Sequence, residues 1–333
     1  MDTALTPPVH GGPDALGVPL HDFSTNANAC GPCPPALAAV RAADCSRYPD
    51  PAYTALRAAL AQWHGVAPAR IVPAASASEF IHRISAHAAR SGLRHVQLPA
   101  HGYGDYARAA QLWGLQPGAQ ALALHWACAP ASPLGDDDPA LAAWAQQAAP
   151  AGALRVLDCA YAPLRLQGVA PALAADAWQL WTPNKALGLT GLRAAYAIAP
   201  PGGEAQAAQL QALAPSWPLG ADGVALLTAW VQPPVQDWLA QSLPLLRAWK
   251  AQQLALCTAL GWQVLAGSLA NYFCVRPGLD GAAGARALQR LRTQGIKLRD
   301  CTSFGLPGVW RLGVLAPPAQ QALARAWGLV AEG

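Results

Sequence analysis

Residues 178–198 have the sequence WQLWTPNKALGLTGLRAAYAI, two apolar runs separated by a loop that contains a lysine. The runs at 178–181 and 194–198 are typical of strands, and the loop carries Lys185, two glycines and Arg193. A lysine at a strand end can lose its proton when it is desolvated, and can then attack a carbonyl carbon. Arg193 could hold a phosphate. A surface loop with ordinary cations is the alternative, and the spacing alone leaves both open.

Strand-like and helix-like runs alternate from about residue 50 to residue 200. The expected strands before the lysine loop are 71–72, 95–98, 121–126 and 156–158. Helices are expected to begin at Asp50-Pro51, where an N-cap precedes a proline, and at the capping box of residues 76–79. Further helices are expected at 105–112 and 139–149. This alternation predicts an α/β fold with a mostly parallel sheet covered by helices on both faces.

The pattern changes after Pro233-Pro234. We expect a long helix at 235–260, bent near Pro244, followed by a lobe that mixes strands and helices. The expected strands of this lobe are 262–265, 272–275, 296–299 and 309–314, and its helices are 282–292 and 320–327. We therefore divide the chain into an N-terminal arm that covers the site (1–35), a large domain (36–230) and a smaller α+β domain (231–333).

Composition excludes several classes of protein. The 333 residues are 53% hydrophobic and 12% charged, which suits a globular chain of about two domains and excludes disorder. The net charge is +4 with no Lys/Arg cluster, so nucleic acid is not an expected partner. No uninterrupted apolar run is long enough for a transmembrane helix, and the first residues do not resemble a signal peptide. We expect a cytoplasmic protein.

The eight cysteines are expected to be free thiols in the cytosol. Cys30 and Cys33 form one CxxC motif with no second pair, so ordinary thiols are favoured over a zinc or redox site. The histidines are scattered, and no group of ligands has zinc-site spacing. No metal site is expected.

Two further stretches carry side chains suited to binding a ligand. Asp158 ends a strand, where α/β folds place ligands, and could pair with a protonated ring nitrogen, while Tyr161 could donate to an oxyanion. The alternatives are a capping aspartate and a packed tyrosine. Residues 73–79 enter a helix N-terminus and could bind an anion, although most capping boxes bind nothing. Together with Lys185, these features fit a phosphorylated aromatic aldehyde with a ring nitrogen, which is pyridoxal phosphate.

The chain resembles the fold-type I pyridoxal-phosphate enzymes of the aminotransferase class I/II superfamily. Within that superfamily it is most similar to the threonine-phosphate decarboxylases of cobalamin biosynthesis, with the histidinol-phosphate aminotransferases as near relatives. The motifs that carry the resemblance span nearly the whole chain. They are HGG at 10–12, DFSTNAN at 22–28, RYPDP at 47–51, IKLRDCTSFG at 296–305 and WRL at 310–312.

The resemblance implies a role for each residue around the cofactor ring. Lys185 would form the Schiff base, Asp158 would keep the ring nitrogen protonated, and Tyr161 would hydrogen-bond the phenolic oxygen. Tyr103 would stack on the ring, with Tyr106 as the alternative.

The resemblance also implies how the cofactor phosphate is held. The backbone groups of Ala77 and Ser78, together with Thr182 and Arg193, would bind it. Tyr48 would reach the phosphate in the other subunit, so a homodimer is expected.

The same resemblance implies a substrate site. Arg311 would pair with the substrate carboxylate, since a bidentate guanidinium suits that group. Arg299 would help to hold a substrate phosphate, together with the N-terminal histidine and glycines. The expected substrate-binding residues are His10, Gly11, Gly12, Asn26, Arg299 and Arg311.

The chain departs from the family pattern at three places. Residues 28–31 lack the usual proline. The turn at 129–135 is APASPLG, so Ser132 stands where the family has an asparagine that bonds the ring oxygen. Alanines 74 and 75 replace the glycines of the cofactor loop.

The resemblance implies decarboxylation of L-threonine O-3-phosphate to (R)-1-amino-2-propanol O-2-phosphate. The alternative activity is an aminotransferase acting on a phosphorylated substrate such as histidinol phosphate. The departures at Ser132 and at residues 74–75 motivate a third hypothesis, a binding or regulatory protein that keeps the enzyme fold without turnover.

Overall fold

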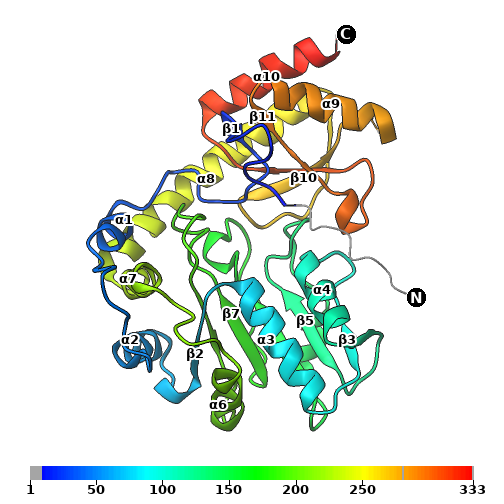
Figure 1. The fold of residues 1–333 in the computed structure, drawn as a ribbon. Coiled ribbons are helices and arrows are strands. Elements are labelled where there is room, and N and C mark those ends of the chain that lie inside the picture. The colour runs from blue at the N-terminus through cyan, green and yellow to red at the C-terminus, as the bar shows by residue number, and fades with distance from the viewer. Residues whose placement is uncertain (1–9, 280, 332–333) are drawn as a thin grey trace.

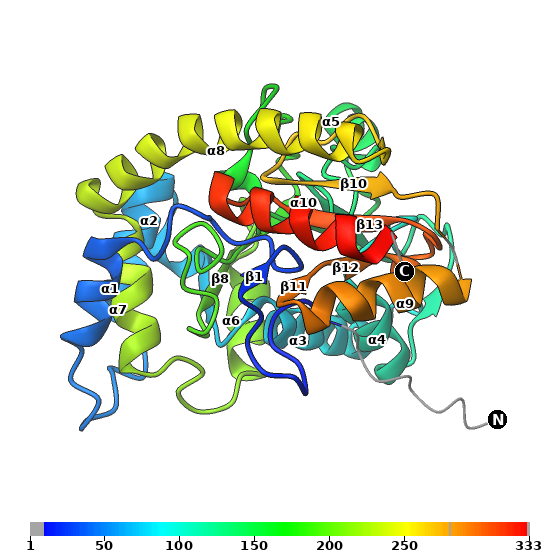
Figure 2. The same ribbon diagram turned by 90° about the horizontal axis from the view of Figure 1, so that it is seen from above.

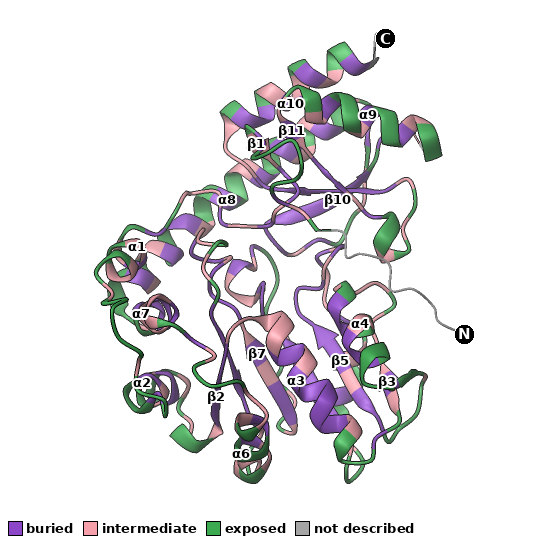
Figure 3. Ribbon diagram, viewed as in Figure 1, coloured by how far each residue is buried: buried purple, intermediate pink, exposed green. Residues whose placement is uncertain are grey.

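The computed structural model describes residues 10–279 and 281–331. Two sheets of different size are joined by a long helix, and the N-terminal segment lies beside the C-terminal elements (Figure 1). Most residues of the central strands of both sheets are buried, while the outer faces of the surrounding helices are exposed (Figure 3). The residues that line the main cavity include members of the larger sheet, of the smaller sheet and of the N-terminal segment, so distant regions of the sequence meet there.

The larger sheet has seven strands in the order β2-β8-β7-β6-β5-β3-β4. Only β8 runs antiparallel to its neighbours β2 and β7, and the other pairs are parallel. The predicted mostly parallel sheet is confirmed. Its strands are β2 (Ile71–Ala74), β3 (His95–Gln97), β4 (Gln116–Pro117), β5 (Leu124–Cys128), β6 (Leu154–Asp158), β7 (Ala177–Trp181) and β8 (Ala195–Ile198).

Helices cover both faces of this sheet, as predicted. One face packs against α3, α4 and α6, and the other packs against α2, α5 and α7. Successive residues of a strand point to opposite faces, so Ile71 contacts one helical layer and Val72 the other. The helices of this part are α1 (Pro34–Arg41), α2 (Thr54–His64), α3 (Ala77–Arg90), α4 (Gly104–Leu112), α5 (Ala140–Gln146), α6 (Glu204–Ala212) and α7 (Ala221–Trp230), with 3-10 turns η1 (Pro68–Arg70) and η2 (Ala162–Leu164).

The smaller sheet is antiparallel in the order β12-β13-β10-β9. Three helices pack on it, and α8 runs from α1 and α7 at one end to this sheet at the other (Figure 2). The elements are α8 (Pro233–Ala259), β9 (Gln263–Val264), β10 (Tyr272–Arg276), α9 (Gly281–Thr293), β11 (Ile296–Lys297), β12 (Arg299–Asp300), η3 (Thr302–Phe304), β13 (Trp310–Gly313) and α10 (Pro317–Ala331). Pro244 lies inside α8, as predicted.

The N-terminal segment contributes a strand to this part of the molecule. Strand β1 (His21–Asp22) pairs in parallel with β11. The predicted strand at 296–299 is therefore divided, because Ile296 and Lys297 pair with β1 whereas Arg299 and Asp300 pair with β13. The domain bounds at residues 35 and 230 stay predictions.

Two predicted helices have different bounds. The helix expected at Asp50 begins at Thr54, because the Asp50 carboxylate accepts hydrogen bonds from the amides of Ala52 and Thr54 and forms a turn instead. The helix expected at 139–149 covers only Ala140–Gln146. Helices α1, α6 and α7 and the short strands β1 and β4 were not predicted.

A buried lysine joins α8 to the loop between β9 and β10. Lys250 is 3% exposed, and its ammonium donates to the carbonyls of Ser268 and Ala270 and to the Ser268 hydroxyl at 2.6–3.1 Å. Three acceptors match the three protons of an ammonium. Burial lowers the pKa of Lys250 to about 8.

No helix in the described ranges is long and apolar enough to cross a membrane.

The segment that contains Cys30 and Cys33 packs against the lysine loop. The amide of Asn28 donates to the Lys185 carbonyl at 2.9 Å, and the amide of Cys33 donates to the Leu187 carbonyl at 2.8 Å. Both cysteines are free thiols. The contact requires Gly188, whose φ is +65° and whose position leaves 2.5 Å between an added Cβ and the Gly31 carbonyl oxygen.

We predict that Gly188→Ala lowers the free energy of unfolding by about 1–3 kcal/mol, because alanine is strained at this φ and collides with backbone. Urea denaturation measures the effect. Gly191→Ala, in the same loop, is the matched control, since nothing lies within 4 Å of its added Cβ. Equal stability of the two variants would contradict the packing described here.

Candidate active site

A cavity of about 690 Å³ lies between the two sheets. Fourteen of the sixteen predicted site residues line it, and Gly12 and Tyr48 do not. The fourteen are His10, Gly11, Asn26, Ala77, Ser78, Tyr103, Ser132, Asp158, Tyr161, Thr182, Lys185, Arg193, Arg299 and Arg311. Their roles stay predictions, but the fold brings them to one place.

Asp158 ends β6 and is 4% exposed. Its two oxygens accept hydrogen bonds from the Tyr106 hydroxyl at 2.6 Å and from the Ala160 amide at 2.9 Å. Burial raises the pKa of Asp158, and the Tyr106 hydrogen bond and the positive charge of Lys185 oppose that rise. The carboxyl is therefore desolvated, with donors that favour its anionic form.

The structure separates the two candidate stacking tyrosines. Tyr106 is buried, and its ring stacks on Trp126 with 4.4 Å between centroids. Tyr103 is half-buried, meets Tyr106 at a right angle, and its hydroxyl lies 3.1 Å from that of Ser78. Tyr103 is thus the better placed of the two for stacking on a ligand, and Tyr106 supports Asp158.

Lys185 projects from the loop between β7 and β8. The loop is closed by backbone hydrogen bonds from Leu187 to Pro183 and from Leu189 to Asn184. The Lys185 ammonium nitrogen lies 5.2 Å from the centroid of the Tyr161 ring. The lysine and Asp158 therefore face the same cavity from the ends of adjacent parallel strands.

The start of α3 is suited to an anion. The Ser76 hydroxyl caps the helix as predicted, since it accepts from the Glu79 amide at 3.1 Å. The Glu79 carboxylate accepts from the Ala75 amide and from Arg83, so it does not complete the capping box. The first helical residues Ala77 and Ser78 line the cavity. The buried Thr182 hydroxyl has no hydrogen-bond partner in the described part of the chain. Helix N–H groups and an unpartnered hydroxyl are suited to an anion such as a phosphate.

Two arginines lie directly opposite each other on neighbouring strands. Arg299 in β12 and Arg311 in β13 are cross-strand partners, and they are 5% and 6% exposed. The nearby Arg311 charge and burial lower the pKa of Arg299, with burial the larger cause. Like charges opposite each other destabilise a sheet. An anionic ligand in the cavity would relieve the repulsion.

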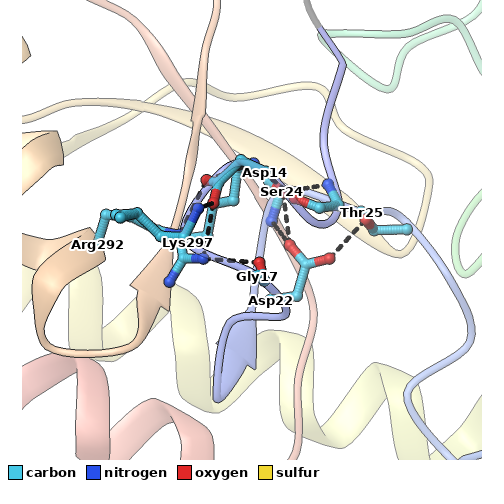
Figure 4. Close-up of polar contacts among 9 residues, drawn as sticks. Asp14, Gly17, Asp22, Ser24, Thr25, Arg292 and Lys297 are labelled. Atoms are coloured by element: carbon cyan, nitrogen blue, oxygen red, sulfur yellow. Dashed lines mark hydrogen bonds and ion pairs between the residues drawn. The ribbon is translucent and has the colours of Figure 1, made fainter.

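An ion-pair cluster fixes the N-terminal segment that reaches the cavity (Figure 4). Asp14 accepts from Arg292 at 2.8 and 2.9 Å and pairs with Lys297 at 2.9 Å. Lys297 also donates to the Gly12 carbonyl, and the Gly12 amide donates to the Ser24 hydroxyl. Gly12 therefore helps to hold the segment, although it does not line the cavity itself. His10 and Gly11 of the same segment do line it.

Tyr48 does not reach the cavity within this chain. It is 77% exposed, and its ring stacks on Trp217 with 4.3 Å between centroids. Together with residues of α1 and α7 it lines a separate, mainly apolar groove.

Two residues that support the predicted ones were not assigned these roles from the sequence. Ser303 accepts a hydrogen bond from Arg299 at 2.7 Å, and Tyr106 was considered only for stacking. Ser303 lies in the quoted motif at 296–305, which was a usable signal. The pairing of Tyr106 with Asp158 spans 52 residues, and no local pattern indicates it.

The cavity residues fit pyridoxal phosphate, the cofactor expected from the sequence. The helix start with Thr182 and Arg193 suits its phosphate, the buried Asp158 suits its ring nitrogen, and Lys185 suits its aldehyde. Each matching group lies on the cavity wall, and Asp158 and Thr182 are desolvated.

We predict that Asp14→Asn loosens residues 10–25. The two cations hold the pKa of Asp14 well below its ordinary value, so the cluster stays ionised at neutral pH and is lost only under strong acid. Amide hydrogen exchange of this segment should rise several-fold. Asp44→Asn, which removes an exposed pair with Arg47, is the control. An unchanged exchange rate in Asp14→Asn would contradict this prediction, and would show that the pairing of β1 with β11 is enough to hold the segment.

We predict that Tyr106→Phe weakens pyridoxal phosphate binding about tenfold or more, since a hydrogen bond to a charged group contributes about 1.5–3 kcal/mol. Without the phenol, burial raises the pKa of Asp158 further and the anion is disfavoured. An absorbance titration gives the affinity. Tyr53→Phe, which loses the hydrogen-bonded hydroxyl of a tyrosine outside this cavity, should bind normally. Wild-type affinity in Tyr106→Phe would exclude this role.

Comparison with known proteins agrees with this geometry. Residues 116–327 match the family model described as aminotransferase class I and II. Histidinol-phosphate aminotransferase of Rhodospirillum centenum is 28% identical, and the match covers 97% of this chain and 95% of that protein.

Solved structures are similar over almost the full length. Histidinol-phosphate aminotransferase from Sinorhizobium meliloti, in complex with pyridoxal-5'-phosphate, has a TM-score of 0.76 and 25% identity, covering 92% of this chain and 89% of that one. L-threonine-O-3-phosphate decarboxylase from Porphyromonas gingivalis has a TM-score of 0.75 and 20% identity, covering 93% and 99%. The chain therefore belongs to the aminotransferase class I and II family, with the fold-type I architecture and pyridoxal phosphate as its cofactor.

Proposed function

We propose that this protein decarboxylates O-phospho-L-threonine to 1-amino-2-propanol phosphate. The observation that carries the proposal is the pair of buried arginines, Arg299 and Arg311, opposite each other in the cavity that also contains Lys185. A substrate with a phosphate and a carboxylate on either side of its amine offers one anion to each guanidinium.

The substrate carboxylate is assigned to Arg311, in the proposal, and its phosphate to Arg299. His10 and Gly11 line the cavity beside these groups, and their segment is held by Gly12. Asn26 is 2% exposed, its side-chain amide nitrogen lies 3.4 Å from the Tyr161 hydroxyl, and its buried Oδ1 is unpartnered among the described residues.

Bound pyridoxal phosphate takes up the electron pair of a bond broken beside the substrate amine. Asp158 holds the proton on the ring nitrogen, which increases that capacity. Arg311 holds the carboxylate so that the bond between it and the amine-bearing carbon is the one aligned for cleavage. After carbon dioxide leaves, the Lys185 ammonium donates a proton to the carbon that lost the carboxylate, so the product keeps its amine and its phosphate.

A second candidate is transamination of a phosphorylated amine such as histidinol phosphate. The name of the relative that matches 97% of this chain favours it. The similarity to the decarboxylase structure, at 20% identity, supports the shared fold alone. The same pocket residues serve both reactions, and the bond cleaved differs, carbon–carboxylate against carbon–hydrogen.

The proposal includes a homodimer in the cytosol. The exposed Tyr48 and the groove between α1 and α7 support it, because the role expected for Tyr48 requires a second subunit. The eight free cysteines suit a reducing compartment.

We predict that the protein loaded with pyridoxal phosphate releases carbon dioxide from O-phospho-L-threonine in equal amount with 1-amino-2-propanol phosphate. Trapped carbon dioxide and mass spectrometry of the product measure the reaction. Lys185→Ala should abolish it, because the amine that binds the cofactor and moves the proton is lost.

Two other results would replace the proposal. Glutamate formed from histidinol phosphate and 2-oxoglutarate, without carbon dioxide from O-phospho-L-threonine, would identify an aminotransferase. Cofactor binding with neither reaction would favour a binding protein that keeps the enzyme fold.

A further inference from the structure

Ser132 occupies a rigid loop at the end of β5. The amide of Ala131 donates to the Asp136 carbonyl and the amide of Gly135 donates to the Ala131 carbonyl, each at 2.6 Å. The Gly135 carbonyl in turn accepts from the Leu269 amide at 2.7 Å. These bonds on both sides fix the place from which the Ser132 hydroxyl projects into the cavity.

The Ser132 hydroxyl contacts Arg311. One terminal nitrogen of Arg311 donates to it at 2.7 Å, and the other donates to the Ser24 carbonyl at 2.9 Å. Both acceptors are neutral, and Arg311 has no ion pair within the described ranges. The buried Nε of Arg311 has no hydrogen-bond partner there either. The guanidinium is therefore held in position while its charge is left for a ligand.

Two kinds of contact restrict this guanidinium differently. Its central carbon lies 5.7 Å from the ring centroids of both Tyr272 and Phe304, and these rings limit its displacement. Aromatic rings do not fix its rotation within its own plane. The hydrogen bonds to Ser132 and Ser24 fix that rotation, and so decide which N–H groups face the cavity.

We propose that Ser132 is a positioning residue that orients Arg311 toward the substrate carboxylate, instead of serving the cofactor ring. The inference rests on the proposed function, in which Arg311 binds that carboxylate. A hydroxyl suits this role because its oxygen accepts from the arginine while its own proton stays available to the bound anion.

The test compares two ligands that differ by one group. O-phospho-L-threonine carries a carboxylate, and 1-amino-2-propanol phosphate lacks it while keeping the amine and the phosphate. In the protein loaded with pyridoxal phosphate, Ser132→Ala should raise the KM for O-phospho-L-threonine about tenfold. The inhibition constant of 1-amino-2-propanol phosphate and the dissociation constant of the cofactor should stay within twofold of their wild-type values. The absorption spectrum of the bound cofactor should be unchanged.

Ser303→Ala is the matched control on the other arginine. Ser303 accepts from Arg299 at 2.7 Å, and Arg299 is assigned to the phosphate that both ligands carry. This variant should raise the KM for O-phospho-L-threonine and the inhibition constant of 1-amino-2-propanol phosphate to a similar extent. The contrast between the two serine variants separates a specific effect on the carboxylate from a general disturbance of the cavity.

A shifted cofactor spectrum or weakened cofactor binding in Ser132→Ala, with unchanged KM, would overturn the inference and assign the hydroxyl to the cofactor. Equal losses of affinity for both ligands in Ser132→Ala would also overturn the inference. Failure of the proposed function shows separately, as absence of carbon dioxide from the wild-type protein. L-glutamate then becomes the carboxylate probe, and a KM unchanged by Ser132→Ala would overturn the inference.

Discussion

Hydrogen bonds from one N-terminal segment, residues 22–33, connect the lysine loop to the smaller sheet. On one side its backbone bonds the carbonyls of Lys185 and Leu187. On the other side the carbonyls of Phe23 and Ser24 accept from the Gly313 amide and the Arg311 side chain. Lys185 and Arg311 are 126 residues apart in the chain, yet they line one cavity. The relative positions of the groups on the two sides of the cavity therefore depend on this segment.

The cavity collects charges that folding alone does not favour. A carboxyl is desolvated at Asp158, and two guanidinium groups lie opposite each other in a sheet. Burying charged groups costs free energy unless partners neutralise them. Tyr106 donates to Asp158, and Ser132 accepts from Arg311, but neither contact brings an opposite charge. These groups line the cavity, where a protonated ring nitrogen and an anionic ligand would each supply an opposite charge.

Local patterns in the sequence predict much of the fold and the chemical groups of the site. Alternating strands and helices predict the mostly parallel sheet, and the capping box at residue 76 predicts the start of α3. Contacts between distant segments could not be predicted in this way. The pairing of β1 with β11 and the contact of Ser132 with Arg311, which spans 179 residues, depend on tertiary packing. The helix start at Thr54 was missed because Asp50 caps it from outside the helix.

We propose that Lys185 is the residue that binds pyridoxal phosphate. The chain has three lysines, Lys185, Lys250 and Lys297, so one mapping experiment tests this assignment. The protein is incubated with pyridoxal phosphate, reduced with borohydride and digested, and the labelled peptide is identified by mass spectrometry. We expect the label on Lys185 alone. A label on Lys250 or Lys297, or no label on any lysine, would rule out this assignment.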